Sequence, residues 1–151
     1  MITLRVDGEP APQGSKSIVS RGGKTWMIEK SRKVEPWRAA IKAAARNGQH
    51  LRLSEPIYAG AVEVTITFTL ARPRSHYGTG RNAEFVKAGA PLYPYTRPDL
   101  DKLVRSTLDG LKIAGLLGDD GQVASLTAHK RYCRDGELPG ADITIEGIGG
   151  L

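Results

Sequence analysis

The sequence predicts an α/β (α+β) fold over residues 1–151, a single domain in which a mixed β-sheet of about four to six strands carries two main helices on one face. Several segments have the two-residue hydrophobic period of strands, and two have the period of amphipathic helices. A chain of 151 residues fits one domain, and no repeat or linker divides it. A doubly wound parallel fold is not expected, because it needs more helices.

The first third predicts a strand, a hairpin and a helix. Residues 2–8 alternate apolar and polar side chains, as a half-buried strand does. Two strand-like runs flank Gly22 and Gly23, which can supply the positive φ angles of a tight hairpin turn. The Ala-rich segment 34–47 predicts a helix that stops near Gly48.

The middle of the chain predicts a long strand and a long connection. Residues 61–71 alternate Val, Ile, Phe and Leu with Glu and Thr, which indicates a sheet with one wet face. Residues 72–98, the basic loop, mix Arg, Lys, Tyr, Pro and Gly without a sustained period. A connection of this length is usually functional or disordered.

The last third predicts the clearest helix and two further strands. The helix begins at 99 and ends at Gly115, and its apolar residues recur at helical spacing: Leu100, Leu103, Val104, Thr107, Leu108 and Leu111. Strand candidates follow at 122–132 and 141–148, with a turn between them.

The net charge, the cysteine content and the lack of sorting signals indicate which partners and which cell compartment to expect. The 22 Lys and Arg residues exceed the 16 Asp and Glu residues, and this net charge of +6 attracts polyanions if the basic side chains cluster. The single Cys133 cannot form an intrachain disulfide. No export signal or apolar run of 18 residues is present, so we expect a cytoplasmic protein without a membrane span.

Four aspartates lie in two pairs, one at the start of the predicted helix 99–115 and one after its end. Asp99 and Asp101 fall in its first turn, where one carboxylate commonly caps the backbone N–H groups and the second is not needed for that role. Asp119 and Asp120 follow in a Gly-Asp-Asp-Gly segment that could equally be a plain turn. If the next strand runs beside 61–71, we expect its start to return near the helix start.

Carboxylates from two segments, surrounded by basic residues, suit a magnesium site for phosphodiester chemistry. Mg²⁺ is typically held by a few carboxylates, and substrate phosphate completes its coordination. The basic residues that would draw in a polyanion are Arg97, Lys102 and Arg105 around the helix start, and Arg74 and Arg81 in the basic loop.

One helix face reads acid, base, acid at Asp101, Arg105 and Asp109. These residues could form two surface ion pairs of little energetic weight. Alternatively, Arg105 stabilises charge that develops on a scissile phosphate. We favour the functional role for Arg105 and a structural one for Asp109.

Residues 97–130 resemble the RusA family of Holliday junction resolvases. The match consists of the Asp-Leu-Asp pair, the following helix with its inner Asp and terminal Gly, the Asp-Asp-x-Gln-Val turn, and a Lys ten residues after Asp120. The resemblance implies a small, phage- or prophage-associated, Mg²⁺-dependent (Mn²⁺ is an alternative) homodimeric endonuclease without an organic cofactor. Such enzymes cut four-way DNA junctions during recombination and repair.

The resemblance also assigns roles to residues. The family's catalytic and metal-binding acids fall on Asp99, Asp101 and Asp120, with Asp119 beside them. The family's catalytic lysine falls on Arg105, which keeps the positive charge but is a poor proton donor. Residues expected to contact DNA are Lys102, Lys130, Arg97, Arg74 and Arg81. The N-terminal third matches the family less well.

The expected reaction is paired, symmetric phosphodiester hydrolysis by water, and two active sites related by a two-fold axis suit the near two-fold symmetry of a junction. Two alternatives stay open. One is a fork or flap nuclease with the same metal chemistry, and the other is a non-catalytic DNA-binding module whose acids merely cap a helix.

Overall fold

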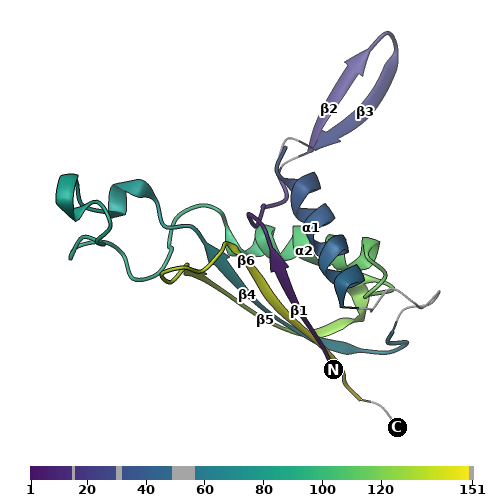
Figure 1. The fold of residues 1–151 in the computed structure, drawn as a ribbon. Helices are drawn as coiled ribbons and strands as arrows, with labels where there is room; N and C mark the ends of the chain where they lie inside the picture. Colours follow the sequence, from purple (N-terminus) through teal and green to yellow (C-terminus); the bar gives the residue numbers. More distant parts are fainter. Residues whose placement is uncertain (15, 30–31, 49–56, 150–151) are drawn as a thin grey trace.

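A mixed sheet with two helices packed on one side forms the body of the protein (Figure 1). The computed structural model describes residues 1–14, 16–29, 32–48 and 57–149. The four-stranded sheet has the order β1-β6-β4-β5, and a separate sheet consists of β2 and β3. The strands are β1 (Ile2–Asp7), β2 (Lys16–Arg21), β3 (Lys24–Glu29), β4 (Val62–Leu70), β5 (Val123–Tyr132) and β6 (Gly140–Gly147). The helices are α1 (Val34–Asn47) and α2 (Leu100–Ile113), so the predicted fold class is confirmed.

The predicted hairpin and the predicted long strand are both confirmed. β2 pairs antiparallel with β3, and the turn residues Gly22 and Gly23 have φ angles of 59° and 75°. β4 carries the apolar residues of its alternating pattern on a fully buried face, as predicted. Thr69 differs from the prediction of a wet face, because it is fully buried near the end of the strand.

The direction of β5 determines the course of the chain. β4 pairs antiparallel with β6 but parallel with β5, with Val62 opposite Val123 and Leu70 opposite Tyr132. A parallel pair needs a crossover connection that returns the chain to the starting end of the first strand. The basic loop and α2 form this connection, and α2 therefore runs antiparallel to both strands.

The two helices meet closely at a glycine. A Cβ atom at Gly110 of α2 would lie 2.6 Å from Cδ1 of Ile41 in α1, so a larger residue at this position would displace the isoleucine. Beside this contact, the buried indole Nε1 of Trp37 donates a hydrogen bond of 3.1 Å to the hydroxyl of Thr107. Arg38 also pairs with Asp109 at 3.4 Å. Packing, a buried polar bond and an ion pair thus fix α2 against α1.

The turn between β5 and β6 is closed by a two-pronged ion pair. Both guanidinium Nη atoms of Arg131 donate to the Glu137 carboxylate, at 2.7 Å and 2.6 Å. The backbone N–H of Arg134 donates to the same carboxylate at 2.9 Å. The side-chain bond from Arg131 and the backbone bond lower the pKa of Glu137 to about 2.

The basic loop contains two short 3₁₀ turns, Arg74–His76 and Gly80–Asn82, and protrudes from the body at the end of β4 (Figure 1). None of the helices among the described residues has the length and apolar character that crossing a membrane requires.

We predict that Thr107→Val lowers the free energy of unfolding by about 1–3 kcal/mol, because the indole N–H of Trp37 then stays buried without an acceptor. Urea unfolding followed by circular dichroism would measure the loss. The same substitution at the partly exposed Thr65 is the control. Equal stability of the two variants would contradict the prediction.

We predict that Glu137→Gln changes the pH dependence of stability. Because folding lowers the pKa of this carboxyl from 4.5 to about 2, its stabilisation is complete above pH 4.5 and is lost as the pH falls towards 2. The variant is therefore less stable at pH 7 and loses less stability than wild type across that window. Unfolding curves at several pH values, with Glu146→Gln as control, test this; parallel curves for wild type and Glu137→Gln would refute it.

Candidate functional site

Two exposed carboxylates stand at the start of α2. Asp99 occupies the N-cap position with extended backbone angles, and Asp101 lies in the first turn. The side chain of Asp99 makes no capping hydrogen bond; its Oδ2 lies 3.3 Å from Nζ of Lys102. Asp99 thus takes the expected N-cap position, but its carboxylate does not cap the backbone N–H groups, so this group is available to a ligand.

Two other segments, β5 and the segment that follows β1, hold the start of α2 in place. Nζ of Lys130 on β5 donates to the carbonyl oxygens of Thr96 and Pro98, at 2.7 Å and 2.9 Å. The backbone N–H of Gln13 donates to the carbonyl of Lys102 at 3.0 Å. The buried hydroxyl of Ser106 donates to the carbonyl of Ala11. Lys130, expected at the DNA surface, thus bonds the backbone that leads into Asp99.

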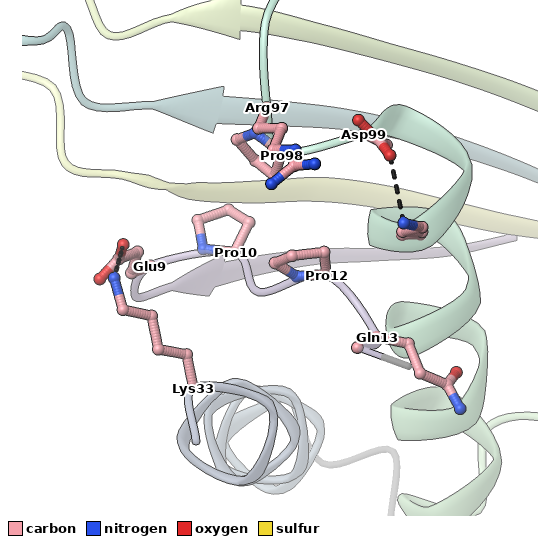
Figure 2. Close-up of a pocket in the computed structure, with 10 residues that line it drawn as sticks. Glu9, Pro10, Pro12, Gln13, Lys33, Arg97, Pro98 and Asp99 are labelled. Carbon is pink, nitrogen blue, oxygen red and sulfur yellow. Dashed lines mark hydrogen bonds and ion pairs between the residues drawn. The ribbon is translucent and has the colours of Figure 1, made fainter. Parts of the chain in front are cut away.

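A pocket of about 520 Å³ opens beside Asp99 (Figure 2). Prolines of the segment after β1 and of the basic loop form part of its wall, and its charged lining residues are Glu9, Lys33, Arg97, Asp99 and Lys102. Glu9 and Lys33 pair with each other at 2.8 Å. The predicted residues Arg97 and Lys102 therefore lie with Asp99 at one pocket.

The contribution of Glu9 and Lys33 to this pocket was not predicted from the sequence. The segment from Glu9 to Gln13 passes beside α2 because its backbone bonds to that helix. Its two prolines were the available signal, since they favour an extended path over a helix or a central strand. The contact partner, however, lies about ninety residues further along the chain, beyond the reach of local patterns.

Arg105 extends from α2 into a neighbouring pocket of about 240 Å³, which Asp101 and Lys102 also line. Within the described part of the chain, Arg105 forms no ion pair with Asp101 or Asp109, so the proposed surface ion pairs are not formed. Asp109 instead pairs with Arg38 of α1, which matches its favoured structural role. The guanidinium of Arg105 is thus exposed beside a carboxylate.

Asp119 and Asp120 lie at a 3₁₀ turn before β5. The Asp119 carboxylate accepts a bond of 2.8 Å from the backbone N–H of Gly121, and Gln122 completes a capping box. This backbone bond, a hydrogen bond with Asp120 and the charge of Lys112 lower the pKa of Asp119. Lys112 Nζ lies 3.7 Å from Asp119 Oδ2 and belongs to the last turn of α2.

The four aspartates therefore form two groups at opposite ends of α2. The helix has 14 residues and a length of about 21 Å. β5 does run beside β4, but the parallel pairing places its start next to the start of β4 and to the far end of α2. The expected return of Asp119 and Asp120 to the helix start is wrong. Within residues 1–14, 16–29, 32–48 and 57–149, no group of three or more His, Cys, Asp or Glu side chains is arranged to hold a metal ion.

The remaining predicted residues, Arg74 and Arg81, lie in the 3₁₀ turns of the basic loop and are exposed. They are separated from the carboxylates by the second half of that loop. Both the loop and the start of α2 nevertheless lie at the same end of the sheet, where β4 ends.

Comparison with known proteins places this arrangement in a family. The family model described as "Endodeoxyribonuclease RusA" matches residues 7–146, which is most of the chain. A comparison with curated proteins found no match. The matched region includes the segment before α1 as well as α2 and both groups of aspartates. The chain therefore belongs to the RusA family of endodeoxyribonucleases, which are Holliday junction resolvases.

Proposed function

We propose that this resolvase is a homodimer that makes paired, symmetric, metal-dependent cuts in four-way junctions, with Asp99 and Asp101 at the centre of each active site. The main support for the proposal is that both carboxylates are exposed and that neighbouring basic side chains surround them. They stand exposed in one helical turn, Asp99 is not used for capping, and basic side chains line the adjoining pockets.

The donor set suits a hard divalent cation. Mg²⁺ prefers oxygen ligands and is commonly held by one or two carboxylates plus substrate phosphate, and Mn²⁺ accepts the same donors. Asp99 and Asp101 would hold the ion, with Lys102 balancing the charge of Asp99 in its absence. A bound ion would polarise the phosphodiester and lower the pKa of a water molecule.

Arg105 is proposed as the residue that holds the scissile phosphate. Its exposed guanidinium shares a pocket with Asp101, and a planar fork with several N–H donors suits the non-bridging oxygens of a phosphate. Its fixed positive charge would stabilise the additional negative charge of the transition state. Arg97 and Lys102 would bind flanking phosphates from the larger pocket, and Lys130 would act as a positioning residue.

A second copy of the chain would complete each set of acids. One chain presents two carboxylates at the start of α2 and two more about 21 Å away at its far end. If the α2 helices of two copies lay antiparallel around a two-fold axis, Asp119 and Asp120 of one copy would approach Asp99 and Asp101 of the other. Two equivalent sites would result, as paired cuts require.

The free edge of the sheet supports this arrangement. β5 is an edge strand, and its Leu126 lies opposite Val64, which is buried on the helix side of β4. Leu126 is nevertheless 45% exposed, beside α2. An apolar side chain next to an unpaired strand edge is a natural contact surface for a second copy.

We predict that Asp101→Asn reduces junction cleavage to below about one hundredth of the wild-type rate while junction binding is retained, because the change removes charge at little cost in shape. A labelled four-way junction, a fork and a linear duplex would be incubated with Mg²⁺ or EDTA. Asp135→Asn, an exposed carboxylate in the β5–β6 turn, is the control. Undiminished cleavage would refute the assignment, and preference for forks would identify a fork nuclease.

We predict that two inactive variants complement each other. In a mixed dimer, one copy carries Asp101→Asn and the other carries Asp120→Asn. If sites are shared, the site formed by Asp101 of the second copy and Asp120 of the first copy is intact. If each site lies within one chain, both sites are defective. Random mixing makes about half of the dimers mixed, and each mixed dimer has one intact site, so about a quarter of all sites are intact. A dimer with one intact site makes single nicks instead of paired cuts. The readout is strand cleavage by the refolded mixture. No nicking by a mixture with proven subunit exchange would rule out shared sites.

A further inference from the structure

We propose that the basic loop of residues 72–98 is a preformed arm that stacks its exposed aromatic rings on unpaired bases at the branch point of the junction. The inference rests on the proposed action on junctions. It extends that function, because it assigns recognition of the substrate's shape to residues outside the carboxylate site.

The outer half of the arm is folded by its own hydrogen bonds. Tyr77 and Val86 form an antiparallel bridge. The backbone N–H of Gly78 donates to the carbonyl of Phe85 at 2.9 Å, and the N–H of Lys87 donates to the carbonyl of His76 at 2.8 Å. These bonds close the tip into a compact turn, so little conformational entropy is left to lose on binding.

The arm is also clamped to the sheet at its base. The guanidinium carbon of Arg72 lies 4.2 Å from the ring centre of Tyr132, and an Nη atom of Arg72 donates to the carbonyl of Pro91 at 2.7 Å. The ring of His76 meets the same tyrosine edge-on, at 5.6 Å between ring centres. Tyr132 is buried at the end of β5, so the arm projects from a rigid support (Figure 1).

The arm exposes three of its aromatic rings to solvent. Among the side chains that the structure describes, the exposed aromatic residues are Phe85, Tyr93 and Tyr95, and all three belong to the arm. Their exposed fractions are 66%, 66% and 78%. Burial of such rings normally stabilises a fold, and a folded segment that leaves three of them uncovered presents a binding surface.

The positive charge of the arm indicates that its partner is nucleic acid. The 27 residues contain five Arg or Lys and one Glu, a net charge of +4 out of the +6 of the whole chain. Basic side chains that alternate with aromatic rings suit unpaired nucleic acid, because the cations hold phosphates while the rings stack on bases. In continuous duplex the faces of the bases are already stacked. The branch point is where a junction can offer free faces.

The position of the arm fits this role. The chain leaves the sheet at the end of β4 and returns directly to Asp99, so the arm and the carboxylates lie at the same end of the molecule. Tyr95 precedes Asp99 by four residues, and Lys130 fixes the backbone between them through Thr96 and Pro98. A base held by the arm would therefore have a defined position relative to the carboxylates.

The test is junction binding by a variant with Phe85→Ala, Tyr93→Ala and Tyr95→Ala. Affinities would be measured in EDTA for a four-way junction and for a linear duplex of the same sequence, with 2-aminopurine at the branch point as a reporter of base stacking. We expect junction affinity to fall about tenfold or more, duplex affinity to stay within about twofold, and the fluorescence change to disappear. The variant should keep the wild-type circular dichroism spectrum, because the rings are exposed.

Two controls separate stacking from other effects. Leu92→Ala removes an aliphatic side chain that is 76% exposed in the same arm, and Tyr93→Phe with Tyr95→Phe keeps both rings; both should bind like wild type. Unchanged junction affinity, an equal loss on duplex, an equal loss in Leu92→Ala, or a change in oligomeric state would each overturn the inference. Junction cleavage by the wild-type protein is assayed separately. If the wild type cleaves junctions and the triple variant binds them as the wild type does, only the proposed role of the arm is wrong. If the wild type binds junctions selectively but does not cleave them, only the proposed catalysis is wrong.

Discussion

The parallel pairing of β4 with β5 is the constraint on which the rest of the structure depends. Between these neighbouring strands the chain must return from the end of β4 to the end of the sheet where β4 starts, and α2 spans that distance. One consequence is the packing of α2 on α1 through Gly110 and the bond between Trp37 and Thr107. The other is the division of the acids between the two ends of the helix. The same feature thus builds the core and separates the acids, which the proposed second copy would bring together.

The start of α2 illustrates how a site can be kept both rigid and reactive. Backbone carbonyls before and within the helix accept hydrogen bonds from Lys130 and Gln13, and the hydroxyl of Ser106 in the helix donates to the carbonyl of Ala11. These contacts fix the main chain. The carboxylates of Asp99 and Asp101 take no part in that support. Lys102 beside Asp99, and Arg105 in the pocket that Asp101 lines, are cations that lower the repulsion of an approaching phosphate. Structural support and the proposed chemistry therefore rest on different atoms of the same helical turn.

Most of the secondary structure could be predicted because burial leaves a local periodic signal. The alternation in β4 and the helical spacing in α2 depend only on which side of an element faces the core. The direction of β5 could not be predicted in this way, since a strand has the same period in parallel and antiparallel pairing. The error about Asp119 and Asp120 follows from that ambiguity. The state of Asp99 was also not predicted, because Lys102, one helical turn away, competes with the backbone N–H groups for its carboxylate and local sequence does not decide which partner wins.

The contacts at the base of the arm separate the position of Asp99 from the sequence of the loop. Arg72 bonds to Pro91 and stacks on Tyr132, and Lys130 fixes Thr96 and Pro98, so the path into α2 is set by the sheet rather than by the tip. We therefore expect that a change of length or sequence within residues 73–90 leaves Asp99 in place. Substrate preference could thus diverge among resolvases of this architecture through changes confined to residues 73–90, while the proposed hydrolytic centre stays the same.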